Sequence, residues 1–214
     1  FLATGSRAHL AGPEGGGGAP EVEGAPEVLP WLPDFADEEA LYRSRGCAWI
    51  PPELREGWGE WEAARAGALP ELVREADIRG VVHAHSTYSD GVDTVEAMAR
   101  ACREAGYGYL VLCDHSRSAF YAGGLPEEAV LRQHAEIDRL NAALAPFRIV
   151  KGIETEILRD GSPDYPDEFL ARFEFVIASV HSSFQMSREA MTERILQALA
   201  HPMVDLVGHP TGRL

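Results

Sequence analysis

Residues 77–91, DIRGVVHAHSTYSDG, decide the fold of this chain. Residues 78–84 form a short apolar run between turn-forming residues, which predicts a β-strand. Side chains two positions apart on a strand point to the same face, so we expect His83 and His85 to project together. Asp90 follows in a Ser-Asp-Gly turn, from which its carboxylate can fold back toward both imidazoles. Two imidazoles and a carboxylate are a ligand set that suits a divalent transition metal.

After this stretch the sequence alternates between apolar runs and helical patterns. Further strands are expected over residues 108–113, 147–153, 173–180 and 204–207, and helices over residues 94–105, 126–144 and 188–200. Strands that alternate with helices of this length indicate βαβ units and a parallel sheet. The strands are apolar throughout, which predicts that the sheet is covered on both faces. We therefore expect an α/β fold.

Each predicted strand ends in a residue that can bind a metal ion. These residues are His83, His85, His115, Glu154, His181 and His209. In a parallel α/β barrel the carboxyl ends of the strands converge on one face, where active sites lie. A single histidine is more often a buried, hydrogen-bonded core residue, but five of the eight histidines at equivalent positions are not explained in that way. His9, His134 and His201 are interpreted as structural residues, with His9 in a flexible leader.

The composition limits the classes of function. The chain has 214 residues, 45% of them hydrophobic, which is enough for one substantial core. A net charge of −15 argues against binding nucleic acid by broad positive charge, but a metal site can bind phosphate because the ions carry the charge. The three cysteines lack CxxC spacing and indicate free thiols in a reducing compartment. We find no signal peptide or membrane-length apolar run, so we expect a cytoplasmic protein without a membrane partner.

The first 76 residues differ from the rest of the chain. Residues 1–30 include four consecutive glycines, Gly15 to Gly18, among prolines, and we expect this segment to be flexible. Short helices are predicted over residues 37–44, 60–67 and 69–75, the first capped by Asp37. A domain boundary is expected near Ala76. The predicted organisation is a mostly irregular and helical segment, residues 1–76, in front of an α/β domain, residues 77–214.

Short motifs lie at the strand ends of the second domain. They are His83-x-His85 with Ser86 and Asp90, Cys113-Asp114-His115, Gly152-Ile153-Glu154, Val180-His181-Ser182 and Gly208-His209-Pro210. In order, spacing and strand position they resemble the PHP (polymerase and histidinol phosphatase) domain. More narrowly, the segments 50–56 (IPPELRE), 77–80 (DIRG), 114–116 (DHS) and 209–214 (HPTGRL) resemble the PHP domain of bacterial family X DNA polymerases. Thr4-Gly5-Ser6 resembles the remnant of a polymerase thumb.

The resemblance implies a distorted (β/α)7 barrel with a trinuclear centre of divalent metal ions, zinc or manganese. By resemblance, His83, His85 and Glu154 hold one ion, and Glu154 bridges to a second ion that His181 and His209 also hold. Asp90 and His115 hold a third ion. The family completes its first and third sites with an Asp-x-His pair near the C-terminal end of the domain. No such pair precedes Leu214, so we expect a barrel that is C-terminally incomplete in this sequence, which is part of a longer protein.

The metal centre implies a chemistry in which Glu154 is the central residue. A bridged pair of ions lowers the pKa of a shared water and binds the phosphate oxygens, so that hydroxide attacks phosphorus and a phosphoester is hydrolysed. Arg117 and Arg213 each follow a ligand motif and are candidate phosphate contacts, since guanidinium can bind phosphate through two hydrogen bonds. A surface ion pair explains each of them equally well. Asp114 either orients a histidine or caps a strand end.

The function that the resemblance implies is 3′–5′ exonuclease activity within a bacterial polymerase X that fills short gaps and trims 3′ ends in DNA repair. The catalytic carboxylates of a polymerase are not in this chain, so DNA with 3′ ends and short gaps is expected as a partner of the full-length protein. One alternative is a small-molecule phosphatase of the histidinol-phosphate type. Another is a PHP module that only supports a polymerase structurally.

Overall fold

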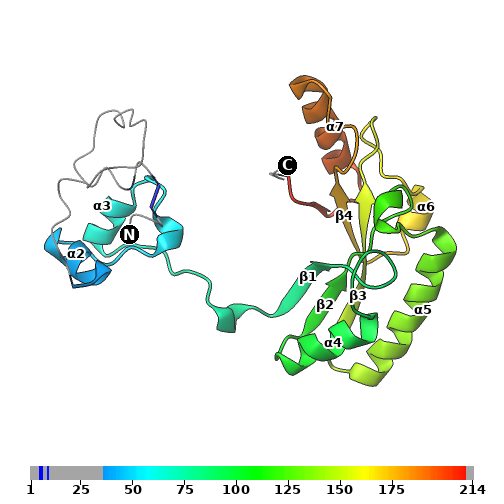
Figure 1. The fold of residues 1–214 in the computed structure, drawn as a ribbon, viewed down its shortest axis with the longest axis horizontal. Helices are drawn as coiled ribbons and strands as arrows, with labels where there is room; N and C mark the ends of the chain where they lie inside the picture. The colour runs from blue at the N-terminus through cyan, green and yellow to red at the C-terminus, as the bar shows by residue number, and fades with distance from the viewer. Residues whose placement is uncertain (1–4, 7–8, 10–35, 211–214) are drawn as a thin grey trace. The chain divides into compact units, whose positions relative to one another are not determined.

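The structure is a computed structural model of the chain, and it describes residues 5–6, 9 and 36–210. The chain divides between Val73 and Arg74 into two compact units (Figure 1). The sequence analysis places this boundary near Ala76. The predicted flexible segment, apart from residues 5–6 and 9, and also Arg213 lie outside the described residues.

The first unit consists of short helices around a small core. Its elements are α2 (Glu38–Ser44), η1 (Pro52–Leu54) and α3 (Glu60–Ala66). The Asp37 side chain accepts a hydrogen bond from the Ala40 amide at 2.7 Å and so caps α2, as predicted. The core of the unit contains Tyr42, Ile50, Trp61 and Ala64.

One helix predicted in this unit does not form. Residues 68–74 have no regular secondary structure, and a single 3-10 turn, η2, follows at Glu75–Asp77. Pro70 accounts for the extended backbone at the start of this segment, because it restricts Leu69 before it to extended conformations. The prediction of a helix over residues 69–75 was wrong.

His9 is a second correction to the sequence analysis. Its Nδ1 lies 2.6 Å from Glu60 Oε1, and its Nε2 lies 2.8 Å from the Tyr42 hydroxyl. The Trp61 indole donates a hydrogen bond to the His9 carbonyl at 3.1 Å, and the two rings stack with their centres 5.0 Å apart. His9 is therefore a buried core residue and not part of a flexible leader. Its partners are 33 to 52 residues away along the chain, so local composition could not predict them.

The second unit is the α/β domain predicted from the sequence. Its strands are β1 (Gly80–Ala84), β2 (Tyr109–Leu112), β3 (Arg148–Glu156), β4 (Phe175–Ser179) and β5 (Leu206–Val207). They form a five-stranded sheet in the order β1-β2-β3-β4-β5, and every neighbouring pair is parallel. The predicted parallel sheet is confirmed.

Helices connect these strands close to the predicted positions. They are α4 (Val95–Glu104), η3 (Phe120–Ala122), α5 (Glu127–Leu144), α6 (Asp167–Leu170) and α7 (Arg188–Ala200). The Thr94 hydroxyl caps α4 by accepting a hydrogen bond from the Ala97 amide at 3.2 Å. The elements η3 and α6 were not predicted, because a single turn is too short to show a helical period. None of the described helices combines the length and the apolar character needed to cross a membrane.

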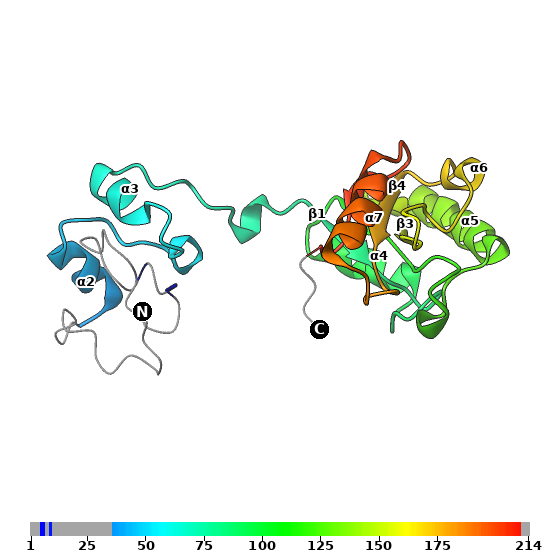
Figure 2. The ribbon, with the colours of Figure 1, turned by 90° about the horizontal axis from the view of Figure 1, so that it is seen from above.

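The helices cover the outside of the curved sheet. Val95 of α4 and Leu140 of α5 belong to one buried cluster with Leu110 of β2. Figure 1 shows α4 and α5 along one side of the strands, and Figure 2 shows the same unit from above. Ala198 of α7 joins Ala178 of β4 in another cluster. The result is a curled half-barrel, an incomplete form of the expected (β/α) barrel.

Candidate metal centre

The carboxyl ends of the strands converge on the side chain of Glu154, which lies near the end of β3 and is only 1% exposed. Its two oxygens face different neighbours. Oε1 lies 3.1 Å from His83 Nε2, 3.3 Å from His181 Nε2 and 2.9 Å from His209 Nε2. These histidines lie at the ends of β1, β4 and β5, where the sequence analysis placed them.

The other oxygen, Oε2, faces the segments that follow β1 and β2. It lies 3.5 Å from His85 Nε2 and 3.0 Å from His115 Nδ1. Asp90 spans these two histidines, with its Oδ1 3.4 Å from His85 Nδ1 and its Oδ2 3.6 Å from His115 Nε2. The structure thus brings together every side chain that the sequence analysis named as a metal ligand.

Two of these histidines have unusual backbone conformations. His83 has a φ of 66° and His209 a φ of 29°, in the left-handed region that residues other than glycine rarely adopt. At His83 the strand bulges, since its register with β2 shifts between Val82 and Ala84. This bulge, and not simple alternation along a regular strand, brings His83 and His85 to the same centre. Backbone strain of this kind is concentrated at functional sites.

Gly208 allows the end of β5 to approach the centre closely. A Cβ atom at this position would collide with the Ser179 hydroxyl and would lie 3.4 Å from the His83 ring. A larger residue would therefore displace the strand end and, with it, His209. Glycine is required here because there is no space for a side chain.

Glu154 is ionised in this environment. Burial by itself would raise its pKa, but the imidazoles of His181 and His83 beside its carboxylate outweigh burial and hold the pKa well below its ordinary value. Hydrogen bonds to Glu154 and then to Glu156 raise the pKa of His181 to about 9. Both oxygens of Glu154 are consequently available to cations near neutral pH.

The ring nitrogens around Glu154 fit bound metal ions. Nδ1 of His85 and Nδ1 of His115 are buried, and within the described residues neither has a partner with hydrogen-bond geometry. Nε2 of His181 lies 3.2 Å from Nε2 of His209, so two potential ligand atoms face each other. Buried polar atoms without partners are costly, and coordination to a cation removes that cost.

The donor atoms form two groups that share Glu154. One group contains His83, Glu154 and His209, the other His85, His115 and Glu154, and the donor atoms of each group lie within 4.8 Å of one another. This grouping differs from the one that the family resemblance implies, in which His83 and His85 share an ion. The distribution of the side chains among three ions stays a prediction.

Glu156, at the end of β3, is a residue of this site that the sequence analysis missed. It is buried, and its Oε2 lies 3.0 Å from His181 Nδ1. Its Oε1 accepts a hydrogen bond from the Ser182 hydroxyl at 2.6 Å and lies 3.5 Å from the guanidinium of Arg194 on α7. A carboxylate on Nδ1 makes that nitrogen the proton donor and leaves Nε2 of His181 as the ligand atom. Strand alternation was the available signal, since Glu154 and Glu156 share a face.

Asp114 holds the loop that carries Asp90. Its Oδ1 accepts hydrogen bonds from the Ser86 amide at 2.7 Å and the Ser89 hydroxyl at 2.5 Å. Its Oδ2 accepts from the Ser86 hydroxyl at 2.7 Å and the Gln133 side chain at 2.6 Å. In the described part of the chain these side-chain bonds do not involve a histidine. Asp114 therefore fixes the loop after β1 to α5 and does not orient a histidine directly.

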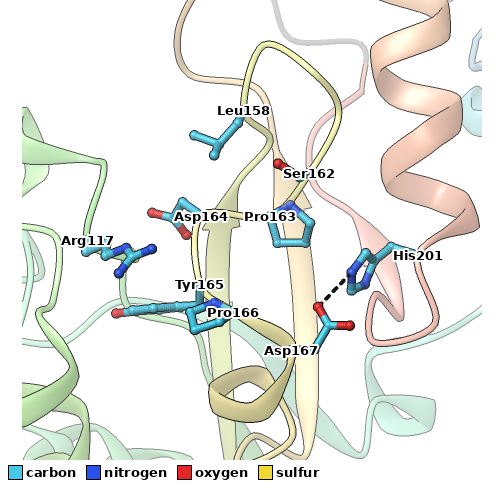
Figure 3. Close-up of a pocket in the computed structure, with 9 residues that line it drawn as sticks. All are labelled: Arg117, Leu158, Ser162, Pro163, Asp164, Tyr165, Pro166, Asp167 and His201. Carbon is cyan, nitrogen blue, oxygen red and sulfur yellow. Dashed lines mark hydrogen bonds and ion pairs between the residues drawn. The ribbon is translucent and has the colours of Figure 1, made fainter.

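Arg117 lines a cavity of about 400 Å³ together with Asp164, Tyr165 and His201. Figure 3 shows its guanidinium directed toward Asp164 and the Tyr165 ring, whose centre is 5.5 Å from the guanidinium carbon. The guanidinium also lies 3.9 Å from the Glu127 carboxylate. On another wall of the cavity, His201 Nε2 lies 3.2 Å from Asp167 Oδ1. The second candidate arginine, Arg213, lies outside the described residues.

A curled α/β half-barrel that gathers histidines and carboxylates at its strand ends defines a class, the metal-dependent hydrolases of the α/β-barrel type. Within that class, the chain belongs to the PHP domain family, whose sequence profile matches residues 82–214.

Comparison with curated proteins gives two kinds of relative. The chain is 43% identical over 180 residues to the DNA polymerase/3'-5' exonuclease PolX of Bacillus subtilis (strain 168), a match that covers 84% of this chain and 31% of that protein. It is 32% identical over 132 residues to a probable phosphatase of Acetivibrio thermocellus and 31% identical over 134 residues to one of Thermoanaerobacter sp. (strain X514). Each phosphatase match covers 60% of this chain and 52% of the relative. The chain thus spans about a third to a half of these relatives.

Proposed function

We propose that this chain is the PHP phosphoesterase module of a bacterial family X DNA polymerase and that it removes nucleotides from 3′ ends of DNA during repair. The observation that carries the proposal is the convergence of five histidines, Asp90 and Glu154 at the strand ends. Similarity to PolX over 84% of the chain supports the polymerase context. In this proposal residues 1–76 are the remnant of the polymerase thumb with a linker, and residues 77–214 are the PHP domain.

The geometry gives each ligand residue a role. Bound divalent ions, manganese or zinc in a trinuclear centre, would supply positive charge to phosphate oxygens and lower the pKa of a coordinated water. Glu154 presents one oxygen to each group of histidines, so a single carboxylate can serve ions on both sides. Asp90 adds a second negative charge on the side of His85 and His115. Glu156 keeps Nε2 of His181 directed at Glu154.

Arg117 and Arg213 are proposed to contact phosphates of the DNA strand. Arg117 follows His115 by two residues, and its side chain is half exposed. Its ion pair with Glu127, at 3.9 Å, is long and solvent-exposed, so a phosphate can replace the carboxylate at little cost. With a net charge of −15, this chain depends on such local contacts and on the ions to attract DNA.

The test is the substitution Glu154→Gln in the full-length protein. Glutamine keeps the size of the side chain but removes the negative charge that two cations share. Manganese-stimulated 3′–5′ exonuclease activity should therefore fall by several kcal/mol of transition-state stabilisation, roughly a thousandfold or more in rate. Gap filling by the separate polymerase domain should survive. A 3′-recessed primer, incubated with and without nucleotides, reports both activities.

The matched control is Glu168→Gln on α6, an exposed glutamate. This variant should retain both activities, because it loses the same charge away from the histidine cluster. Degradation of the primer by Glu154→Gln at the parental rate would rule out the proposed mechanism.

A second candidate function is a small-molecule phosphatase of the histidinol-phosphate type, and the similarity to two probable phosphatases favours it. Release of phosphate from histidinol phosphate, without action on DNA ends, would identify this activity. A purely structural PHP module is the third candidate. It predicts metal binding without hydrolysis of either substrate.

A further inference from the structure

One exposed aromatic side chain, Tyr121, stands beside the metal centre, and a second, Phe120, precedes it in the sequence. Phe120 is 88% exposed and Tyr121 is 69% exposed, and both lie in the η3 turn shortly after His115. Their neighbours Ala119 and Ala122 are buried, so the turn is anchored while the two rings face outward.

The turn holds Tyr121 in a fixed place relative to the metal ligands. The Ala119 amide donates a hydrogen bond to the Ser116 carbonyl at 3.0 Å, and the Leu125 amide donates one to the His115 carbonyl at 2.9 Å. These bonds close the loop at both ends, next to His115 itself. An aromatic ring on such a loop is ordered before a ligand arrives, so binding to it costs little conformational entropy.

The Tyr121 ring borders both halves of the centre. Its centroid lies 6.1 Å from that of His115 and 6.2 Å from that of His181, and both contacts are edge-on. His115 faces Oε2 of Glu154, whereas His181 faces Oε1. In the described part of the chain the Tyr121 hydroxyl has no hydrogen-bond partner, and most of the ring surface is open to solvent.

We propose that Tyr121 is a stacking platform for the base of the 3′-terminal nucleotide whose phosphoester is hydrolysed. This inference rests on the proposed function and adds a binding site to it. A base is joined to its phosphate through one sugar, so a phosphate at the histidine cluster places its base near the rim where Tyr121 lies. An aromatic face accepts every base, as an exonuclease requires, because each base has a π-face.

The charge of this chain favours this mode of capture. Its net charge is −15, so it does not itself supply the broad positive charge by which many proteins attract DNA. Stacking does not depend on charge and holds the end of the strand, where the metal ligands are. A platform next to the centre therefore selects strand ends with an unpaired base over continuous duplex.

The test combines two variants of the full-length protein with two primers in the presence of manganese. One primer ends in a normal nucleotide, and the other ends in an abasic tetrahydrofuran nucleotide. Tyr121→Ala should lower kcat/KM on the normal end roughly 5- to 150-fold, the range expected for one stacked base. Most of this loss should be in KM, because stacking holds substrate and transition state alike. On the abasic end the loss should stay below about twofold, and Tyr121→Phe should match the parent on both ends.

A binding measurement without hydrolysis provides an independent readout. A primer with 2-aminopurine at its 3′ end and a bridging methylene in place of the scissile oxygen, mixed with manganese-loaded protein, should show quenched fluorescence with the parent and with Tyr121→Phe. The quenching should be absent with Tyr121→Ala, while circular dichroism confirms that the variant is folded.

The outcomes separate the two proposals. Equal losses on both primers, or no loss on the normal end, would overturn the stacking platform while the exonuclease function stands. A parent protein that degrades neither primer would overturn the proposed function and this inference with it. A loss confined to the base-bearing end, together with the quenching difference, establishes the platform.

Discussion

The two units of the molecule use buried histidines in opposite ways. In the first unit both ring nitrogens of His9 have partners, Glu60 at 2.6 Å and the Tyr42 hydroxyl at 2.8 Å, and the ring stacks on Trp61. In the second unit His85 and His115 keep buried Nδ1 atoms that have no hydrogen-bond partner within the described residues.

This difference shows how a structural histidine can be told from a metal ligand. Burial alone does not distinguish them, because His115 is buried like His9, although the other ligand histidines are partly buried or exposed. The hydrogen bonding of the ring nitrogens distinguishes the two kinds. In a structural histidine both nitrogens have hydrogen-bond partners within the fold, whereas a ligand histidine leaves a nitrogen available for a cation. His134 is a third kind, since it is buried against Phe173 with its Nε2 unpaired among the described residues and stands outside the cluster.

Replacing His115 and His9 with alanine, one at a time, is the strongest test of the comparison. His115→Ala should lower manganese-dependent hydrolysis at least about 100-fold, the upper end of the loss seen when a residue that supports a metal is removed. It should leave the folding of the metal-free chain nearly unchanged. His9→Ala should do the reverse: it should destabilise the first unit by roughly 3 kcal/mol, because Glu60 and Tyr42 lose a buried partner, and leave hydrolysis intact.

The chain supplies its own probe for this experiment. All four tryptophans precede Val73, so tryptophan fluorescence in urea reports the first unit of this chain by itself. A shifted urea transition by circular dichroism in metal-free His115→Ala, or lost hydrolysis in His9→Ala with its fluorescence transition retained, would contradict the distinction.

Glu156 refines the comparison, because it is the protein partner of one ligand histidine, His181, at its Nδ1. Glu156→Gln keeps an oxygen near His181 Nδ1 but removes the charge, so affinity for manganese should fall about 10- to 100-fold. Titration calorimetry of the metal-free chain measures this affinity, with Glu168→Gln as the control. The fold should persist, since Arg194 also donates hydrogen bonds to the carbonyls of Leu158 and Ser182. Unchanged affinity for manganese would show that Glu156 contributes only to packing.

The smallest expected effect concerns pH and His134. Burial, and then the charge of Lys151, lower the pKa of His134 from 6.5 to about 4. Between these values the unfolded chain binds more protons than the folded chain, so stability is complete above about pH 6.5 and is lost as the pH falls toward 4. The parent should lose about 2 kcal/mol more than His134→Leu between pH 7 and pH 5. Circular dichroism in urea, with a chelator present, measures both proteins. Parallel losses would show that His134 titrates normally.

Much of the metal centre could be predicted from the sequence, because regular strands repeat the same arrangement. Each apolar run ends in a histidine or a glutamate, and parallel strands bring equivalent ends together. The ligand residues could therefore be recognised by their position at the end of each strand in a repeated strand–helix unit. The bulge at His83 changed the local backbone but not the convergence, since the side chain still reaches Glu154 at 3.1 Å.

The residues that escaped prediction depend on irregular or distant structure. Tyr121 lies in a single 3-10 turn, which has no period to recognise. His9 is fixed by contacts to residues far along the chain, which composition cannot show. In each case a side chain's direction was set by tertiary packing.

The left-handed backbone at His83 and His209 has a consequence for how the protein interacts with the cell around it. Both imidazoles are oriented by the fold itself, so an ion that dissociates leaves a site already shaped for the next one. Exchange of ions then requires no refolding. Affinities of such nitrogen and oxygen sites follow a general order among the divalent metals, and the protein's geometry can correct that order only in part. The identity of a bound divalent ion would therefore follow the supply of free ions in the surrounding medium.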